Sequence, residues 1–215
     1  MSLIAVVDYG MGNLRSVDKA LEHVAQAGQE VRITSDANEI AAADRVVFPG
    51  QGAARDCMRE LEQRNLIEPV RQAASEKPFL GICMGLQVLM AHSEENEGVD
   101  CMGLYPGEVR FFGKVLNKST TAVPLKIPHM GWNNVTQTIS HPLWHGIRQV
   151  SRFYFVHSYY VDPVDEAIVA GETEYDVVFT SAIACDNVFA VQFHPEKSAA
   201  DGLQLLKNFT GWDGN

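Results

Sequence analysis

Four short strand-like segments, the first of them a continuous apolar run rich in β-branched residues, place the strongest constraint on the fold of this chain. They cover residues 3–7, 30–34, 45–48 and 78–82. The run at residues 3–7 is typical of a strand that is buried on both faces of a sheet, and the other three are expected to be strands beside it. Segments with apolar residues at helical spacing alternate with them, at residues 16–27, 55–75 and 85–92. Strands that alternate with helices predict a parallel sheet covered by helices on both faces.

The pattern changes after about residue 98. Strand-like segments separated by turns follow one another, at residues 109–112, 132–136, 152–156, 168–172, 177–184 and 188–193. Helical spacing returns only at residues 199–209, so the second half is expected to be antiparallel or mixed. We find no repeat or linker, and 215 residues suit one domain. We therefore expect residues 1–215 to form a single-domain, three-layer α/β sandwich. Its central sheet is mostly parallel, with helices on both faces and antiparallel strands in the second half.

Charge and cysteine usage exclude several classes of partner and compartment. The chain has 27 acidic and 17 basic residues and a formal net charge of −10, whereas nucleic acids and anionic membranes bind clustered Lys and Arg. No stretch approaches the roughly 18 apolar residues that cross a bilayer, and the N-terminus lacks the basic region of a signal peptide. The four cysteines form no C-x-x-C pair, so we expect free thiols in a reducing cytoplasm.

The sequence Gly-Ile-Cys-Met-Gly at residues 81–85 stands where a buried strand is expected to meet a helix. This spacing matches a nucleophile elbow with Cys83 in place of serine. The glycines permit a tight turn, and the N-terminus of a helix starting at Met84 would favour a thiolate. The alternative is a small buried cysteine in a glycine-flanked turn, and the motif alone does not decide between the two.

A second candidate group is Phe-His-Pro-Glu at residues 193–196, just after an apolar strand. In an extended segment residues i and i+2 point to one face, so Glu196 could orient the imidazole of His194. Alone, this tetrapeptide suits an ordinary surface turn better. Together with an elbow cysteine, it supplies a nucleophile, a base and an orienting acid, all expected at the carboxyl ends of strands.

A third candidate is the loop Pro-Gly-Gln-Gly at residues 49–52, which directly follows a strand. Glycines there would let backbone N–H groups approach a substrate closely, so the loop could bind an oxyanion together with the N–H of Met84. The alternative is a plain turn, which a Pro-Gly pair also permits.

In combination, these motifs resemble the class I glutamine amidotransferases, which use a Cys-His-Glu triad. The resemblance rests on residues 81–85 with Gln87, on residues 49–52 and on residues 193–198. Within that family, the chain is most similar to the glutaminase subunits of imidazole glycerol phosphate synthases. The segments that carry this finer resemblance are residues 8–13, 128–133 and 154–159. The resemblance runs nearly from end to end.

The resemblance implies a role for each matching residue. Cys83 would attack the side-chain carboxamide of L-glutamine, His194 would pass the thiol proton to the departing ammonia, and Glu196 would hold the imidazole. Water would then hydrolyse the glutamyl thioester to glutamate. The substrate would be bound by Gln87, His157, Ser158 and Tyr159. The oxyanion would be stabilised by N–H groups at Gly50, Gln51, Gly52 and Met84, and the loop is expected to need a peptide flip before it can act.

The resemblance also implies a partner, because the glutaminase fills the whole chain. The partner would be a cyclase subunit with a (β/α)8 barrel, forming a heterodimer and using ammonia to make imidazole glycerol phosphate and an aminoimidazole carboxamide ribotide in histidine biosynthesis. The expected docking residues are Asn13, Met130, Gly131, Trp132, Asn133 and Lys197. For Trp132 a place in the core is an equally open alternative.

Other functions remain as alternatives at this stage. One is a class I glutaminase subunit that serves another synthase; others are a cysteine peptidase or γ-glutamyl hydrolase on the same scaffold, and a binding module without turnover. No cofactor or metal is expected. His141 and His145 have the i, i+4 spacing of a metal pair, but Pro142 stands where a zinc motif needs its glutamate.

Overall fold

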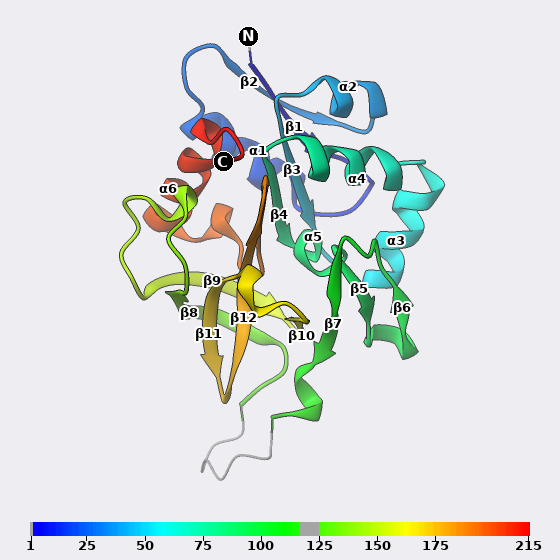
Figure 1. Ribbon diagram of the computed structural model, residues 1–215, viewed down its shortest axis with the longest axis vertical. Coiled ribbons are helices and arrows are strands. Elements are labelled where there is room, and N and C mark those ends of the chain that lie inside the picture. The colour runs from blue at the N-terminus through cyan, green and yellow to red at the C-terminus, as the bar shows by residue number, and fades with distance from the viewer. Residues whose placement is uncertain (1, 117–124) are drawn as a thin grey trace.

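The computed structural model describes residues 2–116 and 125–215, and a parallel block of five strands forms its centre. Their order across the sheet is β2-β1-β3-β4-β13. Their bounds are β1 (Ser2–Val7), β2 (Gln29–Thr34), β3 (Arg45–Gly50), β4 (Phe79–Cys83) and β13 (Val188–Val191). The first four correspond to the strands predicted at residues 3–7, 30–34, 45–48 and 78–82. The fifth comes from near the end of the chain and is the orange strand beside β4 in Figure 1.

Helices cover both faces of this block, as predicted (Figure 1). On one face lie α1 (Leu14–Val24) and α6 (Ala199–Gly211), and on the other α2 (Ala37–Ala42), α3 (Ala54–Gln63) and α4 (Ile67–Glu76). Residues of β1 alternate between the two layers, as the pleat of a strand requires. Ile4 and Val6 pack into the core under α1 and α6, whereas Ala5 and Val7 pack into the core under α2, α3 and α4.

The rest of the sheet is mostly antiparallel, also as predicted. From β13 the order continues β12-β10-β7-β5-β6, and β11, β8 and β9 branch from β12. Only β5 and β7 pair in parallel among the described strands of this part. The bounds are β5 (Met90–Ser93), β6 (Val99–Asp100), β7 (Tyr105–Phe111), β8 (His129–Gln137), β9 (Ser151–His157), β10 (Tyr159–Pro163), β11 (Val169–Tyr175) and β12 (Val177–Cys185).

One predicted element is wrong. The helix expected over residues 85–92 is only α5 (Met84–Gln87), and the chain then enters β5. Val88, Leu89 and Met90 are fully buried. Val88 and Leu89 form a buried turn, and from Met90 on, pairing with β7 makes the chain a strand instead of a continued helix. The strands β6 and β10 and the helix α2 were not predicted at all.

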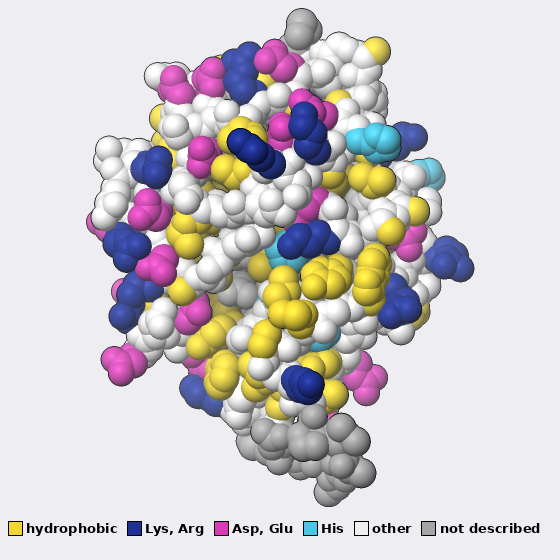
Figure 2. All heavy atoms as spheres, turned by 180° about the vertical axis from the view of Figure 1, so that it is seen from behind, with side chains coloured by type: hydrophobic (Ala, Val, Ile, Leu, Met, Phe, Trp, Pro, Cys, Tyr) yellow, Lys and Arg dark blue, Asp and Glu magenta, His cyan; other side chains and the backbone are white. Residues whose placement is uncertain are grey.

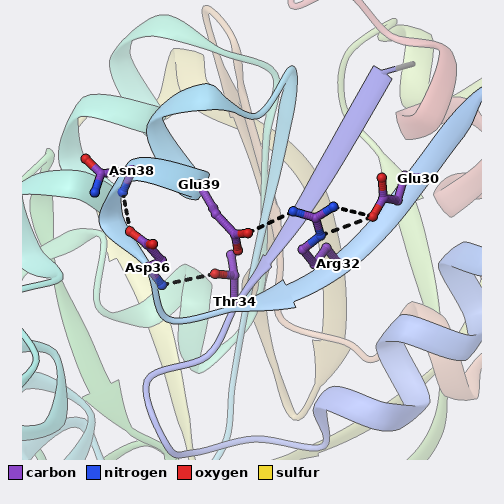
Figure 3. A network of polar contacts seen from close by, with 6 residues as sticks. All are labelled: Glu30, Arg32, Thr34, Asp36, Asn38 and Glu39. Atoms are coloured by element: carbon purple, nitrogen blue, oxygen red, sulfur yellow. Dashed lines mark hydrogen bonds and ion pairs between the residues drawn. The ribbon is translucent and has the colours of Figure 1, made fainter.

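A network of polar groups closes the turn between β2 and α2. Its members are Glu30, Arg32, Thr34, Asp36, Asn38 and Glu39 (Figure 3). Asp36 is the N-cap of α2, and its carboxylate accepts a hydrogen bond from the backbone N–H of Asn38 at 2.8 Å. Arg32 bridges the carboxylates of Glu30 and Glu39. The network therefore anchors the short helix α2 to a strand at the edge of the sheet.

Two further findings concern the residues that the structure describes. None of their helices is long and apolar enough to cross a membrane. No group of three or more His, Cys, Asp or Glu side chains among them could hold a metal ion. The nearest candidate in the sequence, His141, instead caps a short 3-10 helix (Pro142–Trp144) by accepting a hydrogen bond from the N–H of Leu143.

Candidate active site

The register of three parallel strands brings the predicted motifs together. Gly50, at the end of β3, lies opposite Cys83 at the end of β4. On the other side of β4, Val191 lies opposite Ile82. The residues that follow β13 therefore continue beside Cys83. The carboxyl ends of neighbouring parallel strands form the ligand crevice in sheets of this kind, as the sequence led us to expect.

Cys83 sits on a strained turn between β4 and α5. Its backbone has φ 56° and ψ −106°, a region that L-residues rarely occupy and that costs about 1–3 kcal/mol. The flanking glycines make the turn possible. A Cβ on Gly85 would lie 1.9 Å from the carbonyl oxygen of Phe48, and one on Gly81 would lie 2.8 Å from the carbonyl oxygen of Gly85. This is the geometry predicted for a nucleophile elbow.

The electrostatic support for the Cys83 sulfur differs from the expected one. Because α5 has only four residues, it cannot supply the expected helix dipole. A side chain supplies a donor instead: Nε2 of Gln192 donates a hydrogen bond to Sγ of Cys83 at 3.6 Å. Gln192 is fully buried. The sequence analysis missed it, although it lies only two residues before His194.

His194 and Glu196 form a buried pair. Nδ1 of His194 lies 2.9 Å from Oε1 of Glu196, and the two side chains are 2% and 1% exposed. The pairing was predicted, but the extended backbone was not correct. Glu196 lies in a short 3-10 helix (Pro195–Lys197) that brings its carboxylate back onto the imidazole. Ser198 holds this turn, since its hydroxyl donates to the carbonyl of His194 and accepts from the N–H of Tyr154.

The charge on His194 is set by its neighbours. Burial alone would lower its pKa, but the neighbouring Cys83 side chain and the Glu196 carboxylate together raise the pKa to about 10. The imidazole is therefore held as a cation at neutral pH beside the Cys83 sulfur. Its Nε2 has no hydrogen-bond partner among the described residues and remains available to a ligand. A cysteine and an acidic imidazole that line the same cavity can together attack an amide and protonate its leaving group.

These groups line one cavity of about 470 Å³. Its lining includes most of the predicted site residues, namely Gln51, Gly52, Cys83, Met84, Gln87, His157, Ser158, Tyr159 and His194. Lys197, expected at the docking face, also lines it. Glu95 is a lining residue that the sequence analysis missed, and nothing in its local sequence marks it. Its carboxylate accepts a hydrogen bond from the N–H of Ala54 at 2.7 Å, and burial raises its pKa.

Two predicted site residues, Gly50 and Gln87, are held by tight packing or by hydrogen bonds to other residues of the site. Gly50 is packed behind the cavity, where a Cβ would be 2.4 Å from the hydroxyl oxygen of Tyr9 and 2.7 Å from Cβ of Met84. Only glycine fits there, so any contribution of Gly50 comes from its backbone. Gln87 is 3% exposed, and its amide donates to the carbonyl of Tyr159 at 3.1 Å and to Oε1 of Gln192 at 2.9 Å.

The expected docking residues of β8 do not share one face of the strand. Met130 is 61% exposed and Trp132 is 44% exposed, so the alternative of a core position for Trp132 is wrong. Trp132 packs edge-on against Tyr154. Side chains alternate along a strand, and Asn133 points to the other side, where it donates to the carbonyl of Glu174.

Comparisons with known proteins identify the family of this chain. The family model "Glutamine amidotransferase class-I" matches residues 5–211. The chain belongs to this family. The resemblance inferred from the motifs is thereby confirmed, and the strained cysteine and the His-Glu pair are the parts that a class-I glutamine amidotransferase of the Cys-His-Glu type was expected to contain.

Relatives with similar sequences align with this class-I glutamine amidotransferase over nearly its full length. It is 58% identical over 212 residues to "Imidazole glycerol phosphate synthase subunit HisH" of Hydrogenovibrio crunogenus, covering 99% of this chain and 97% of the relative. It is 59% identical to the subunit of the same name from Pseudomonas putida, over 100% and 99% of the two chains. It is 60% identical to the subunit of the same name from Dechloromonas aromatica, over 97% of this chain and 96% of the relative.

Solved structures of low sequence identity share the fold. "Structure of PurLQS from Thermotoga maritima" superposes with a TM-score of 0.71 at 19% identity, covering 98% of both chains. "Crystal structure of glutamine amidotransferase" gives a TM-score of 0.68 at 15% identity, over 97% of this chain and 99% of the other. These similarities confirm the α/β architecture of the class-I glutamine amidotransferase.

Proposed function

We propose that this chain is the glutaminase subunit of an imidazole glycerol phosphate synthase, acting as one domain over residues 1–215. It hydrolyses L-glutamine to glutamate and ammonia, and it hands the ammonia to a separate (β/α)8 cyclase subunit. The observation that carries the proposal is the 58% identity over 99% of the chain to a subunit of that name. The same breadth of similarity disfavours the alternative, a glutaminase subunit that serves another synthase.

The geometry suits a two-step hydrolysis through a thioester. In the first step the Cys83 thiolate attacks the carboxamide carbon, and the C–N bond breaks as the His194 imidazolium gives its proton to the leaving nitrogen. Ammonia and a glutamyl thioester result. In the second step neutral His194 takes a proton from water, whose oxygen attacks the thioester and expels the thiolate. Glu196 stabilises the cation in each cycle, because it pairs with the opposite nitrogen of the ring.

The cavity also offers complementary groups for the ends of a glutamine molecule. Glu95 contributes a carboxylate to the lining, which suits the α-ammonium group. The segment of residues 157–159 closes the cavity on the β9–β10 side, where we propose that its backbone binds the α-carboxylate and α-amino groups. Gln51, Gly52 and Met84 lie along the lining near the sulfur, and we propose that their N–H groups receive the oxyanion.

We further propose that the cyclase subunit docks on exposed hydrophobic side chains of this chain. Figure 2 shows hydrophobic side chains gathered over the middle and lower part of one face. Met130 and Trp132 are among the most exposed large hydrophobic residues described, and their spacing of two places them on the same side of β8. Lys197 is exposed and lines the catalytic cavity, so a partner that touches it would reach the edge of the active site.

The compartment and the lack of cofactors are part of the same proposal. All four cysteines are free, which fits a reducing cytoplasm. Hydrolysis of an amide by a Cys-His-Glu arrangement requires neither a metal nor a redox group, so we propose that the subunit works without a cofactor.

A steady-state glutaminase assay with and without the cyclase subunit and its ribotide ligand tests the proposal. We expect very low activity from the chain alone and a large increase in turnover when both are present. Full activity of the lone chain would contradict control by the partner. Activation by a chorismate-dependent synthase instead of the cyclase would favour the alternative function.

A Cys83→Ala variant tests the hand-over of ammonia in the assembled synthase. Synthesis from glutamine should be abolished, while synthesis from added ammonium should be kept, because the cyclase is untouched. Cys185→Ala serves as the matched control, since Cys185 lies outside the cavity lining. Loss of both activities in Cys83→Ala would argue against ammonia as the transferred species.

A further inference from the structure

Two buried histidines that touch each other connect β8 with the active-site cavity. Nδ1 of His129, at the start of β8, lies 2.8 Å from Nε2 of His157, at the end of β9. The other ring nitrogens are also engaged. Nε2 of His129 lies 3.2 Å from Nδ2 of Asn133, and Nδ1 of His157 lies 2.7 Å from the carbonyl oxygen of Tyr159. Every ring nitrogen of the pair therefore has one partner.

The direction of these hydrogen bonds follows from the partners at the Asn133 end. Oδ1 of Asn133 accepts from the backbone N–H of Asn134, which can only donate. Nδ2 of Asn133 donates to the carbonyl of Glu174, which can only accept. The amide orientation is thus decided by two unambiguous partners. Nδ2 consequently donates to Nε2 of His129, which must be the unprotonated nitrogen of that ring.

The same logic assigns the protons of both rings. A neutral imidazole has one N–H, so His129 carries it on Nδ1 and donates to Nε2 of His157. His157 then carries its proton on Nδ1 and donates to the carbonyl of Tyr159, which can only accept. Burial lowers the pKa of His129 to about 4 and that of His157 to about 3, so both rings are neutral at pH 7. From Asn133 to the carbonyl of Tyr159, all donors point the same way.

From Tyr159 the contacts continue to the sulfur. Its carbonyl accepts a second hydrogen bond, from Nε2 of Gln87 at 3.1 Å. That same amide donates to Oε1 of Gln192 at 2.9 Å, which leaves Nε2 of Gln192 to donate to Sγ of Cys83. Gln87 and Gln192 are buried, so these amides have little freedom to find other partners.

We propose that His129 and Asn133 are positioning residues for the nucleophile. Asn133 sets the ring tautomer of His129, His129 sets that of His157, and the two amides that follow hold a donor against Sγ of Cys83. The chain of contacts runs between two hollows of the surface. One is the catalytic cavity, which His157 lines, and the other is a groove lined by His129, Met130, Trp132 and Asn133. The Tyr159 carbonyl, held by His157 and in turn by Gln87, is the link through which a change at Asn133 would reach the donor at the Cys83 sulfur.

This inference adds two residues to the proposed function and rests on it only in taking Cys83 as the nucleophile. Side-chain nitrogen NMR of 15N-histidine-labelled protein tests the assignment directly. We expect both His129 and His157 to be neutral with the proton on Nδ1. A proton on Nε2 of either ring, or a charged ring at pH 7, overturns the proposal.

Asn133→Asp tests the consequence for the sulfur, because it keeps the shape of the side chain but replaces the donor by an acceptor. We expect the tautomer signals of both histidines to change. Alkylation of Cys83 by iodoacetamide, followed by mass spectrometry, should become about tenfold slower. Glutaminase kcat of the assembled synthase should fall by a similar factor, with KM changed less than threefold. Asn133→Ala, which removes the donor without adding charge, should shift each readout in the same direction.

Asn134→Asp is the matched control, because it makes the same change of charge on the adjacent, exposed residue. It should leave the tautomers and the alkylation of Cys83 at wild-type values. Cys101 and Cys185 provide an internal reference in every sample. Equal Cys83 rates in the Asn133 and Asn134 variants would overturn the proposal. A wild-type protein with the expected tautomers but no glutaminase activity would instead refute the proposed function.

Discussion

The Cys83 side chain owes its setting to its own backbone and to two buried partners. The left-handed φ of 56° costs free energy, and the turn packs so closely on neighbouring backbone that positions 81 and 85 have no room for a Cβ. His194 on one side and Gln192 on the other then provide a cation and a neutral donor. A strained position, a charge and a hydrogen bond thus act on a single sulfur atom.

Glu196→Gln should show how much of the activity depends on the charge behind His194. The amide keeps the size of the carboxylate but cannot stabilise the imidazolium, so the pKa of His194 should fall. We expect kcat for glutamine hydrolysis to drop on the order of 10²- to 10⁴-fold, since the loss of an orienting carboxylate has effects of this size elsewhere. A pH–rate profile of the assembled synthase measures both changes.

Glu166→Gln is the control for this variant, because Glu166 is exposed and lies outside the cavity lining. It makes the same chemical change and should retain wild-type kcat. If Glu196→Gln also kept kcat within twofold, the carboxylate would have a structural role only.

At the scale of elements, local sequence patterns predicted what depends on local structure. The four parallel strands of the first half, the helices α1, α3 and α4 and the cysteine turn were predicted correctly, because hydrophobic period and glycine spacing encode them. The helix over residues 85–92 was wrong because sheet pairing determines that segment. Glu95, Gln192 and the contact between His129 and His157 were missed for a similar reason, since each depends on contacts between elements distant in the sequence.

Gly85→Ala should unfold the turn between β4 and α5 rather than only slow the chemistry. The new Cβ would lie 1.9 Å from the carbonyl oxygen of Phe48, which belongs to the fixed backbone of β3. We expect the free energy of unfolding, measured with urea, to fall by more than about 3 kcal/mol. Gly103→Ala is the control: it has φ +66° but open space around it, so it should cost only about 1 kcal/mol.

At the scale of the molecule, the order of the strands assembles the site. β13 enters the sheet beside β4 more than one hundred residues after it, and this insertion carries residues 192–196 to Cys83. β9 and β10 close the cavity from the antiparallel part. The active site therefore exists only when both halves of the chain have folded together, and conditions that loosen either half should remove it.

Buried neutral histidines should make the whole fold sensitive to acid. Burial lowers the pKa of His129 and His141 to about 4 and of His157 to about 3. The unfolded chain takes up these protons near pH 6.5, whereas the folded chain does not until the pH is much lower. The contribution of these histidines to the free energy of unfolding should therefore be complete above pH 6.5. It should be lost progressively as the pH drops towards 4.

Urea unfolding at pH 7.5, 6 and 5 measures this slope. His141→Asn should make the slope shallower, because it removes one of the three groups and can keep the acceptor that caps the short helix. His145→Asn, at an exposed histidine four residues later, should show the wild-type slope. A wild-type slope in His141→Asn would mean that this histidine has the same pKa in the folded and the unfolded chain.

Trp132→Ala should weaken assembly without affecting the fold of the subunit. Trp132 is 44% exposed and contacts Tyr154 only edge-on among aromatic side chains, so little of the core depends on it. A large aromatic side chain buried by a partner commonly contributes about 2 kcal/mol or more, and a loss of that size raises Kd for the cyclase about thirtyfold. Calorimetric titration measures Kd, and Val178→Ala, at an exposed side chain on β12, is the control. An unaltered Kd in Trp132→Ala would move the docking face away from β8.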